Sequence, residues 1–295
     1  MEATLHRVTG DELPALRDWL KHHLPETFRL YNTTEEIIRG RWQGTSFLTL
    51  GWPDIQAVGE GPVSPDDIDC AAYFMEPRVT CVFSPSPDQL TRLLTAPDIY
   101  DWTRPILFFV FSTRLSPTIR EVSEARGGNP DRAQRQACRL VARPGDVPLL
   151  PVPEELEARA LDPDLHSDLV YSNWDHSRKH CDLYIRQLLG RFPSVGLFDK
   201  SGRCVAHELG KHYGTIGFLH VHEEFRGRGL GKVVLSLLAH KYLSQGLTVT
   251  TLVFADHKHS LAMHTSMGFH IEGDLHLYTH YIGAPDENEG ILNFG

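Results

Sequence analysis

The chain has 295 residues, with 38 acidic and 29 basic side chains and a formal net charge of −9. This length suggests two domains of about 150 residues each, and the 41% hydrophobic content excludes wholesale disorder. The acidic surplus argues against a dedicated nucleic-acid-binding protein, which usually carries excess lysine and arginine. The longest apolar run, residues 106–111, is far shorter than the ~18–20 residues of a membrane-spanning helix. We therefore expect no nucleic-acid partner and no membrane segment.

The first half of the chain mixes helical and strand patterns. The predicted elements are helices over residues 11–23 and 88–94 and strands over residues 45–50 and 106–111. Closely spaced prolines and a glycine then predict an extended, proline-rich linker over residues 144–154. We therefore expect a first domain over residues 1–143.

The second half shows a more regular alternation of strands and helices. The predicted elements are helices within residues 168–189 and over 230–243 and 259–266, and strands over 194–198, 204–209, 215–221, 247–254 and 271–281. The helix over residues 230–243 is amphipathic, with its valines and leucines gathered on one side. This order predicts an α/β (α+β) fold with a ligand beyond the strand ends. We expect the second domain to cover residues 155–283, followed by a polar tail over residues 284–295.

A glycine-rich turn lies between a predicted strand and the amphipathic helix. It consists of Arg226, Gly227, Arg228, Gly229, Leu230, Gly231 and Lys232. Glycine permits positive φ and close approach to the backbone, and the unpaired N–H groups at a helix start favour an anion. The P-loop pattern fails because Val233 follows Lys232, and the dinucleotide pattern G-x-G-x-x-G also fails. The turn predicts a phosphate or pyrophosphate site of another kind, and a plain glycine-rich turn or an RNA-binding patch is the alternative.

The turn matches the pattern Q/R-x-x-G-x-G/A in full, through Arg226, Gly229 and Gly231. It resembles the coenzyme A pyrophosphate signature of the GNAT superfamily of N-acyltransferases, and Gly268-Phe269 resembles the end of the superfamily's helix beside the pantetheine arm. Other segments resemble the glycine N-acyltransferase family, in the same order along the chain. They are residues 24–31, 52–54, 66–69, 101–102, 174, 184–185 and 192–194. The resemblance implies two tandem GNAT-like domains, each a mixed twisted sheet flanked by helices, with the coenzyme A turn in the second.

The resemblance implies an N-acyltransferase that moves an acyl group from acyl-CoA to the amine of glycine or a similar small amino acid by direct transfer. It implies Glu224 as the general base, the backbone N–H near Val221 as the group that binds the thioester oxygen, and residues 226–232 as the cradle for coenzyme A. Acyl-CoA is a co-substrate, and no permanently bound cofactor is implied. His264 replaces the superfamily's usual tyrosine and is a weak candidate for the proton donor.

Three positions depart from the family pattern. Glu223 stands where the family has proline, and His207-Glu208 stands where the family has Trp-Asp in the preceding strand. If Glu223 and Glu224 extend a strand, only one of them faces the site. His220 and His222 share a predicted strand face, but no cysteine or carboxylate completes a recognised ligand set, so we predict no metal site.

Two other functions are compatible with the sequence. A GNAT acetyltransferase could act on another amine, such as a peptide N-terminus, a lysine or a polyamine, which the negative net charge would suit. A non-catalytic acyl-CoA-binding module is the second alternative. The family resemblance implies a mitochondrial location, with the cytoplasm as the alternative. The acyl chain, the acceptor and the oligomeric state are not determined by the sequence.

Overall fold

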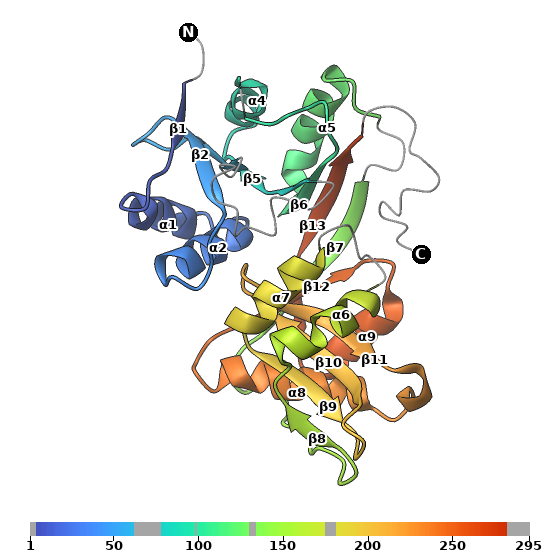
Figure 1. Cartoon of the computed structure of the whole chain (residues 1–295). Helices are drawn as coiled ribbons and strands as arrows, with labels where there is room; N and C mark the ends of the chain where they lie inside the picture. The colour runs from blue at the N-terminus through green and yellow to red at the C-terminus, as the bar shows by residue number, and fades with distance from the viewer. Residues whose placement is uncertain (1–3, 62–77, 98, 130–133, 175–180, 282–295) are drawn as a thin grey trace. The chain divides into compact units, whose positions relative to one another are not determined.

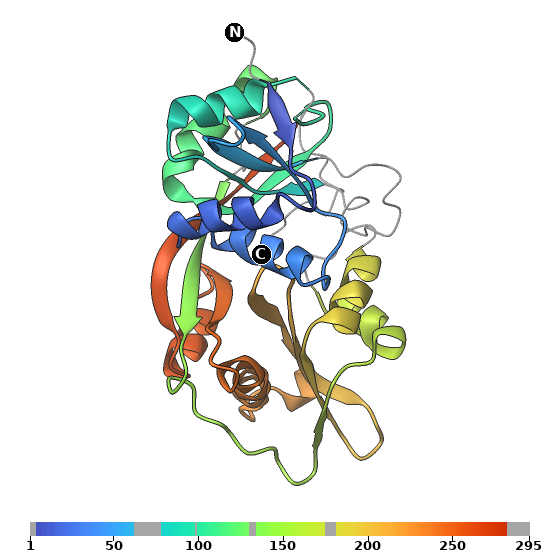
Figure 2. The same ribbon diagram turned by 90° about the vertical axis from the view of Figure 1, so that its left-hand side faces the viewer.

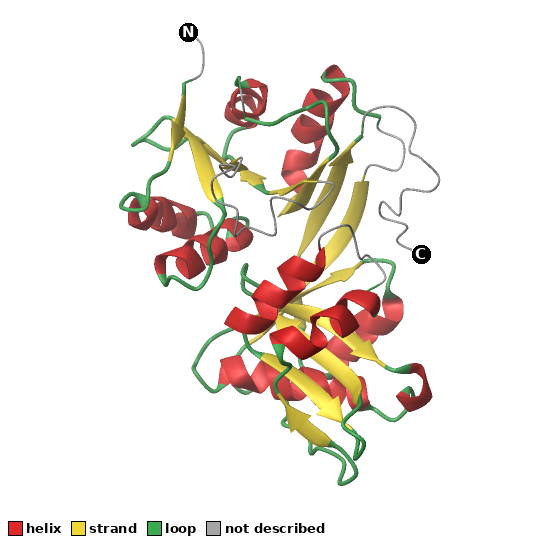
Figure 3. Ribbon diagram, in the orientation of Figure 1, coloured by secondary structure: helices red, strands yellow, loops and turns green. Residues whose placement is uncertain are grey.

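The computed structural model describes residues 4–61, 78–97, 99–129, 134–174 and 181–281 (Figure 1). These residues form two compact units, each with its own hydrophobic core. Unit 1 contains the described residues up to Gln136 and those from Asp274 onward, and unit 2 contains those from Ala137 to Gly273. Both units combine strands with helices (Figure 3), so the predicted mixed α/β class is confirmed.

Unit 1 confirms the four elements predicted for the first half of the chain and adds others. Its elements are β1 (Leu5–Arg7), α1 (Leu13–His22), α2 (Phe28–Ile38), β2 (Ser46–Leu50), β3 (Ala57–Gly61), β4 (Arg78–Thr80), β5 (Val82–Phe83), α4 (Pro87–Thr95), β6 (Ile106–Ser112), the 3-10 turn η1 (Thr113–Leu115), α5 (Ser116–Ala125) and the end of β13 (His270–His280). Helix α2 was not predicted, because it buries polar residues such as Arg29, Thr33 and Thr34 and so lacks a clear apolar period.

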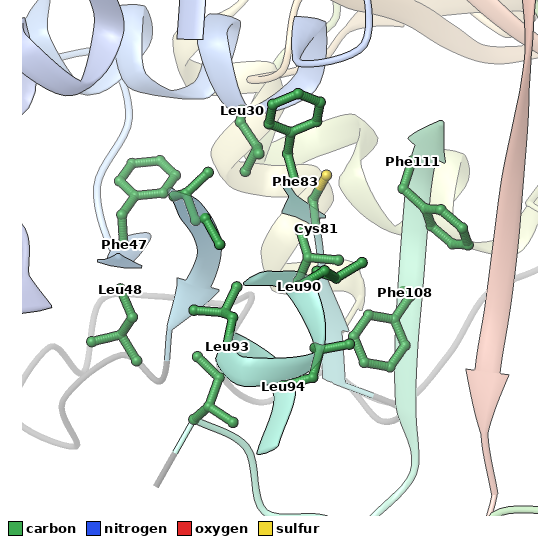
Figure 4. Packing of buried hydrophobic residues seen from close by; sticks show 14 of the residues in the cluster. Leu30, Phe47, Leu48, Cys81, Phe83, Leu90, Leu93, Leu94, Phe108 and Phe111 are labelled. Atoms are coloured by element: carbon green, nitrogen blue, oxygen red, sulfur yellow. The ribbon is translucent and has the colours of Figure 1, made fainter. Parts of the chain in front are cut away.

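The core of unit 1 is built from its strands and from helices α1, α2, α4 and α5. Strands β1, β2, β3 and β5 form one antiparallel sheet in that order, while β4 runs parallel to β6 and β6 runs antiparallel to β13. Leu90, Leu93 and Leu94 of α4 are fully buried against aromatic residues including Phe47 and Phe108 (Figure 4). Each such side chain contributes about 1.5–3 kcal/mol by leaving water, so unit 1 has an independent apolar core.

Unit 2 follows the predicted alternation closely. Its elements are β7 (Gln134–Ala142, from Ala137 onward), β8 (Glu157–Arg159), α6 (Pro163–Ser172), α7 (Cys181–Arg191), β9 (Ser194–Phe198), β10 (Cys204–Gly210), β11 (Thr215–Val221), the 3-10 turn η2 (Glu223–Phe225), α8 (Leu230–Leu243), β12 (Val249–Phe254), α9 (Lys258–Ser266) and the start of β13. The strand order is β7-β12-β11-β10-β9-β8, with β11 and β12 parallel and the other neighbours antiparallel. The sheet lies between α8 on one face and α6 with α7 on the other (Figure 2).

The compact units divide the chain differently from the predicted domains. Residues 137–142 of β7 pair with β12 and so belong to unit 2, while the chain from Asp274 returns to unit 1. The proline-rich segment is irregular, as predicted, but it is part of unit 2 rather than a free linker. Ser236 of α8 donates to the Pro148 carbonyl at 2.7 Å and accepts the Leu150 N–H at 2.8 Å. The segment therefore covers a second side of α8, whose burial extends beyond the predicted apolar stripe. The predicted tail lies outside the described residues.

Candidate active site

The glycine-rich turn joins β11 to α8 through η2, in the predicted strand–turn–helix order. Gly227 and Gly229 both have φ of +77°, in the left-handed region that glycine adopts without steric cost. A Cβ added at either glycine would meet no atom within 4 Å, so the backbone here is uncovered. Within the described residues, the N–H groups of residues 227–231 donate to no backbone carbonyl. The turn therefore presents a set of free donors at the start of a 14-residue helix, an arrangement that favours an anion.

Three cationic side chains surround this turn. Arg226 is anchored at the end of β11, where its Nε donates to the Val221 carbonyl at 3.1 Å. Arg228 donates to the Glu224 carbonyl at 3.3 Å and holds its guanidinium carbon 5.0 Å from the centre of the Phe225 ring. Lys232 lies half-buried in the first turn of α8. These charges add to the helix dipole and favour a polyanion such as a pyrophosphate. The residues predicted for the cradle are thus brought together.

Strands β11 and β12 separate before they reach the turn. Among the described residues, their parallel ladder consists of the pairs Thr215↔Thr250 and Ile216↔Thr251. Beyond these pairs β11 contains a bulge. Phe218 has φ of +57°, and the register of β11 with β10 shifts at this point. A non-glycine residue in this region costs about 1–3 kcal/mol and persists only where the surrounding fold enforces it. Bulges of this kind are common beside active sites, where they redirect backbone groups.

The backbone N–H and C=O of Val221 point away from β10, toward the side of β11 where the ladder with β12 has ended. The next residue, His222, donates its N–H to the Val205 carbonyl of β10 at 2.8 Å. Hydrogen bonds to one antiparallel neighbour fall on alternate residues, so the N–H and C=O of Val221 lie on the β12 side. A backbone N–H at such an edge is suited to an oxygen that gains negative charge. The oxygen-binding role of Val221 stays a prediction.

Glu224 lies on η2 rather than on β11, so the strand alternation expected for Glu223 and Glu224 is wrong. Both side chains reach solvent, and the Glu224 side chain is 66% exposed. Its Oε2 pairs with Nη1 of Arg203 at 3.0 Å, and Arg203 also donates to Nε2 of His222 at 2.5 Å. Arg203 carries no local signal in the sequence, because only the antiparallel pairing of β10 with β11 brings it to the turn.

His264 is buried within α9, where it contacts the helix backbone and the ring of Phe269. Its Nδ1 donates to the Ser260 carbonyl one turn earlier, at 2.8 Å, and its ring packs edge-on against Phe269 at 5.6 Å. Burial lowers the pKa of His264, which keeps the ring neutral at pH 7. With its proton engaged by the helix backbone, the ring has no N–H free for a leaving thiolate. This arrangement fits a structural histidine better than a proton donor.

His207 and Glu208, the two residues of β10 that differ from the family pattern, are both buried. His207 accepts from Nδ2 of Asn173 at 3.2 Å and stacks on His220 at 5.6 Å. Burial, reinforced by repulsion from His220, lowers the pKa of His207 to about 4. Glu208 is fully buried, and neither carboxyl oxygen has a hydrogen-bond partner among the described residues. Burial raises the pKa of Glu208 to about 8, while the charge of Lys211 opposes the shift. At pH 7 both side chains are mainly uncharged.

The predicted pair His220 and His222 does not act together. His220 faces His207, whereas His222 contacts Arg203. Over the ranges that the structure describes, no three histidine, cysteine or acidic side chains gather as metal ligands. In those ranges no helix combines the length and the apolar character needed to cross a bilayer.

Two family models together cover most of the chain. A model described as aralkyl acyl-CoA:amino acid N-acyltransferase matches residues 5–193, and a model described as FR47-like protein matches residues 194–276. A mouse protein named glycine N-acyltransferase-like protein is 23% identical over 250 residues, which cover 77% of this chain and 81% of that protein. The mouse glycine N-acyltransferase-like protein Keg1 is 22% identical over 224 residues, covering 70% and 75%.

Solved structures share the fold at low sequence identity. A Drosophila protein from a structural genomics consortium aligns with a TM-score of 0.79 at 17% identity, covering 96% of this chain and all of that one. A tandem GNAT protein from the clavulanic acid biosynthesis pathway aligns with a TM-score of 0.57 at 13% identity, covering 96% and 100%. The predicted tandem GNAT-like architecture is therefore confirmed. The first family model spans more than half of the chain, and the chain, a GNAT-type acyltransferase, therefore belongs to the aralkyl acyl-CoA:amino acid N-acyltransferase family.

Proposed function

We propose that the chain transfers an acyl group from acyl-CoA to the amine of glycine or a similar small amino acid. The observation that carries this proposal is the combination of an uncovered anion cradle at residues 226–232 with a bulged strand that turns backbone N–H groups away from β10. The cradle suits the pyrophosphate of coenzyme A, and the strand edge suits the thioester carbonyl. Family membership supports the use of acyl-CoA with an amino acid.

The chemistry is a direct transfer. The amine nitrogen attacks the thioester carbon, the carbonyl oxygen takes up negative charge beside the Val221 N–H, and the C–S bond then breaks to release coenzyme A as a thiolate. The amine loses a proton to a base, because amino-acid amines are largely protonated at pH 7. Burial raises the pKa of the Cys204 thiol to about 11, so this cysteine stays protonated and is unsuited to form an acyl-enzyme.

Glu224 is our proposed general base. It lies three residues after Val221 and two residues before the first residue of the cradle, Arg226. Its pairing with Arg203 is exposed on both sides, and exposed ion pairs contribute only about 0–1 kcal/mol. The carboxylate can therefore exchange Arg203 for a substrate ammonium group at little cost. Family resemblance alone supports a mitochondrial location.

A thiol-release assay with a matrix of donors and acceptors tests the proposal. Phenylacetyl-CoA and acetyl-CoA are the donors, and glycine, glutamine, spermine and a peptide with a free N-terminus are the acceptors. We expect coenzyme A release to depend on the small amino acids. Release with spermine or the peptide alone would instead identify another amine acceptor. Tight binding of coenzyme A without turnover on any amine would indicate a binding module.

A further inference from the structure

Arg203 stands directly before β10, at the end of the turn that joins β9 to β10. The N–H of His222 donates to the Val205 carbonyl at 2.8 Å, which fixes the start of β10 beside the end of β11. Arg203 is thereby brought to the residues that follow Val221. Its side chain is 44% exposed, so a ligand can reach the guanidinium group from solvent.

The guanidinium group of Arg203 contacts two residues at the end of β11. Its Nη1 donates to Oε2 of Glu224 at 3.0 Å, and its Nη2 lies 2.5 Å from Nε2 of His222. The nearby Asp199 carboxylate accepts the backbone N–H groups of Ser201 and Arg203 and is engaged within its own turn. Within the described residues, Glu224 is therefore the anion that contacts this guanidinium group.

An attacking amine must separate this ion pair. The ammonium group of the acceptor takes the place of Arg203 beside Glu224, and the carboxylate then removes its proton. An acceptor without an anionic group leaves the guanidinium group without its Glu224 partner. An acceptor with a carboxylate gives each charge a new partner, so one ion pair becomes two. Arginine suits this role, because its planar fork matches the two oxygens of a carboxylate.

We propose that the guanidinium group of Arg203 binds the carboxylate of the acceptor amino acid while Glu224 receives the amine, an assignment that rests on the proposed function. Nη1 and Oε2 of the pair lie 3.0 Å apart, and in an α-amino acid two bonds separate the amine nitrogen from the carboxylate carbon. A short zwitterion therefore fits against the pair with its charges reversed. The contact with His222 keeps the guanidinium group at the turn during the exchange.

This arrangement selects amino acids over other amines. A primary amine that lacks a carboxylate breaks the Arg203–Glu224 pair and supplies no anion in return. A polyamine or a lysine side chain adds a further positive charge, which the guanidinium group repels. Arg203 thus acts against the cationic acceptors that the net charge of the chain would favour.

Glycinamide tests the assignment, because it retains the amine of glycine but lacks the carboxylate. Arg203→Met removes the charge and keeps an unbranched side chain. We expect kcat/KM for glycine to fall roughly 10- to 100-fold, the loss typical of a hydrogen bond to a charged group. The value for glycinamide should stay constant or rise, because its amine no longer competes with Arg203 for Glu224. Arg203→Lys keeps the charge and should retain part of the preference for glycine.

Arg186→Met is the matched control. Arg186 of α7 forms an exposed ion pair with Asp164 that is also 3.0 Å long, but this pair joins α7 to α6 and not β10 to the turn. The variant should change kcat/KM for neither acceptor. Coenzyme A affinity, measured by calorimetry, reports whether each variant is correctly folded.

The outcomes separate this assignment from the proposed function. An equal loss for glycine and glycinamide in Arg203→Met would show that Arg203 acts on Glu224 alone, and it would overturn the assignment, as would an unchanged value for glycine. A wild-type protein that acylates glycinamide as efficiently as glycine also overturns it, without the need for a variant, but leaves the acyltransferase activity. A wild-type protein that releases coenzyme A with no amine overturns both proposals.

Discussion

Replacing Glu208 with glutamine tests whether a buried carboxyl group makes the stability of unit 2 depend on pH. Glu208 is fully buried without a hydrogen-bond partner among the described residues, and burial raises its pKa from 4.5 to about 8 against the opposing charge of Lys211. Between these pH values the folded protein holds a proton that the unfolded chain has released. The free energy of unfolding therefore falls as the pH rises through this window. Most carboxyl groups in proteins act in the opposite direction.

The size of the effect follows from the width of the window. Each pH unit between 4.5 and about 8 lowers the free energy of unfolding by up to about 1.4 kcal/mol, so the total approaches about 5 kcal/mol. Glutamine has the shape of protonated glutamate and no charge. Its amide lacks a hydrogen-bond partner, as the protonated carboxyl group does, and this cost does not vary with pH. Glu208→Gln should therefore gain stability relative to the wild type as the pH rises.

Urea unfolding followed by circular dichroism at pH 5, 6, 7, 8 and 9, at constant ionic strength, measures this difference. We expect the stability of the variant minus that of the wild type to increase steadily from pH 5 to pH 8 and then level off. Glu223→Gln is the matched control, because Glu223 is exposed on η2, and its difference from the wild type should not vary in this way. A constant difference between Glu208→Gln and the wild type across all five pH values would refute the reasoning.

Three further substitutions test the site. Gly229→Ala forces a side chain into φ of +77° at a cost of roughly 1–2 kcal/mol, so KM for acyl-CoA should rise. The control is Gly202→Ala, at φ of +85° in the turn before β10. It should lower the unfolding midpoint and leave the KM for acyl-CoA unchanged. Glu224→Gln should reduce kcat about 100-fold at pH 7 with partial recovery at higher pH, and a pH–rate profile like that of the wild type would contradict the base assignment. His264→Gln should keep kcat but lower thermal stability, whereas a large fall in kcat would restore the histidine as proton donor.

Local patterns were sufficient for most elements of unit 2. The glycine turn and the helix after it could be predicted because their residues are contiguous and their backbone needs, positive φ and a free helix start, are set locally. Helix α2 escaped prediction because Arg29 is buried in an ion pair with Glu60 at 2.8 Å, a partner 31 residues away that no local period reveals. The proline-rich segment was correctly predicted to be irregular, but its attachment to Ser236 depends on packing.

One part of the candidate site could likewise be predicted from the sequence, and another part depends on the tertiary structure. The cradle at residues 226–232 and the resemblance it carries follow from the sequence, because seven neighbouring residues supply the whole motif. The contacts of Arg203 with Glu224, of His207 with His220 and of Lys211 with Phe218 instead depend on the register of β10 against β11. A shift of one residue moves every side chain of a strand to the other face, and the bulge at Phe218 introduces such a shift inside β11. The sequence alone therefore determined the glycine-rich turn and the α/β plan, whereas only the tertiary structure decided which charges meet beside it.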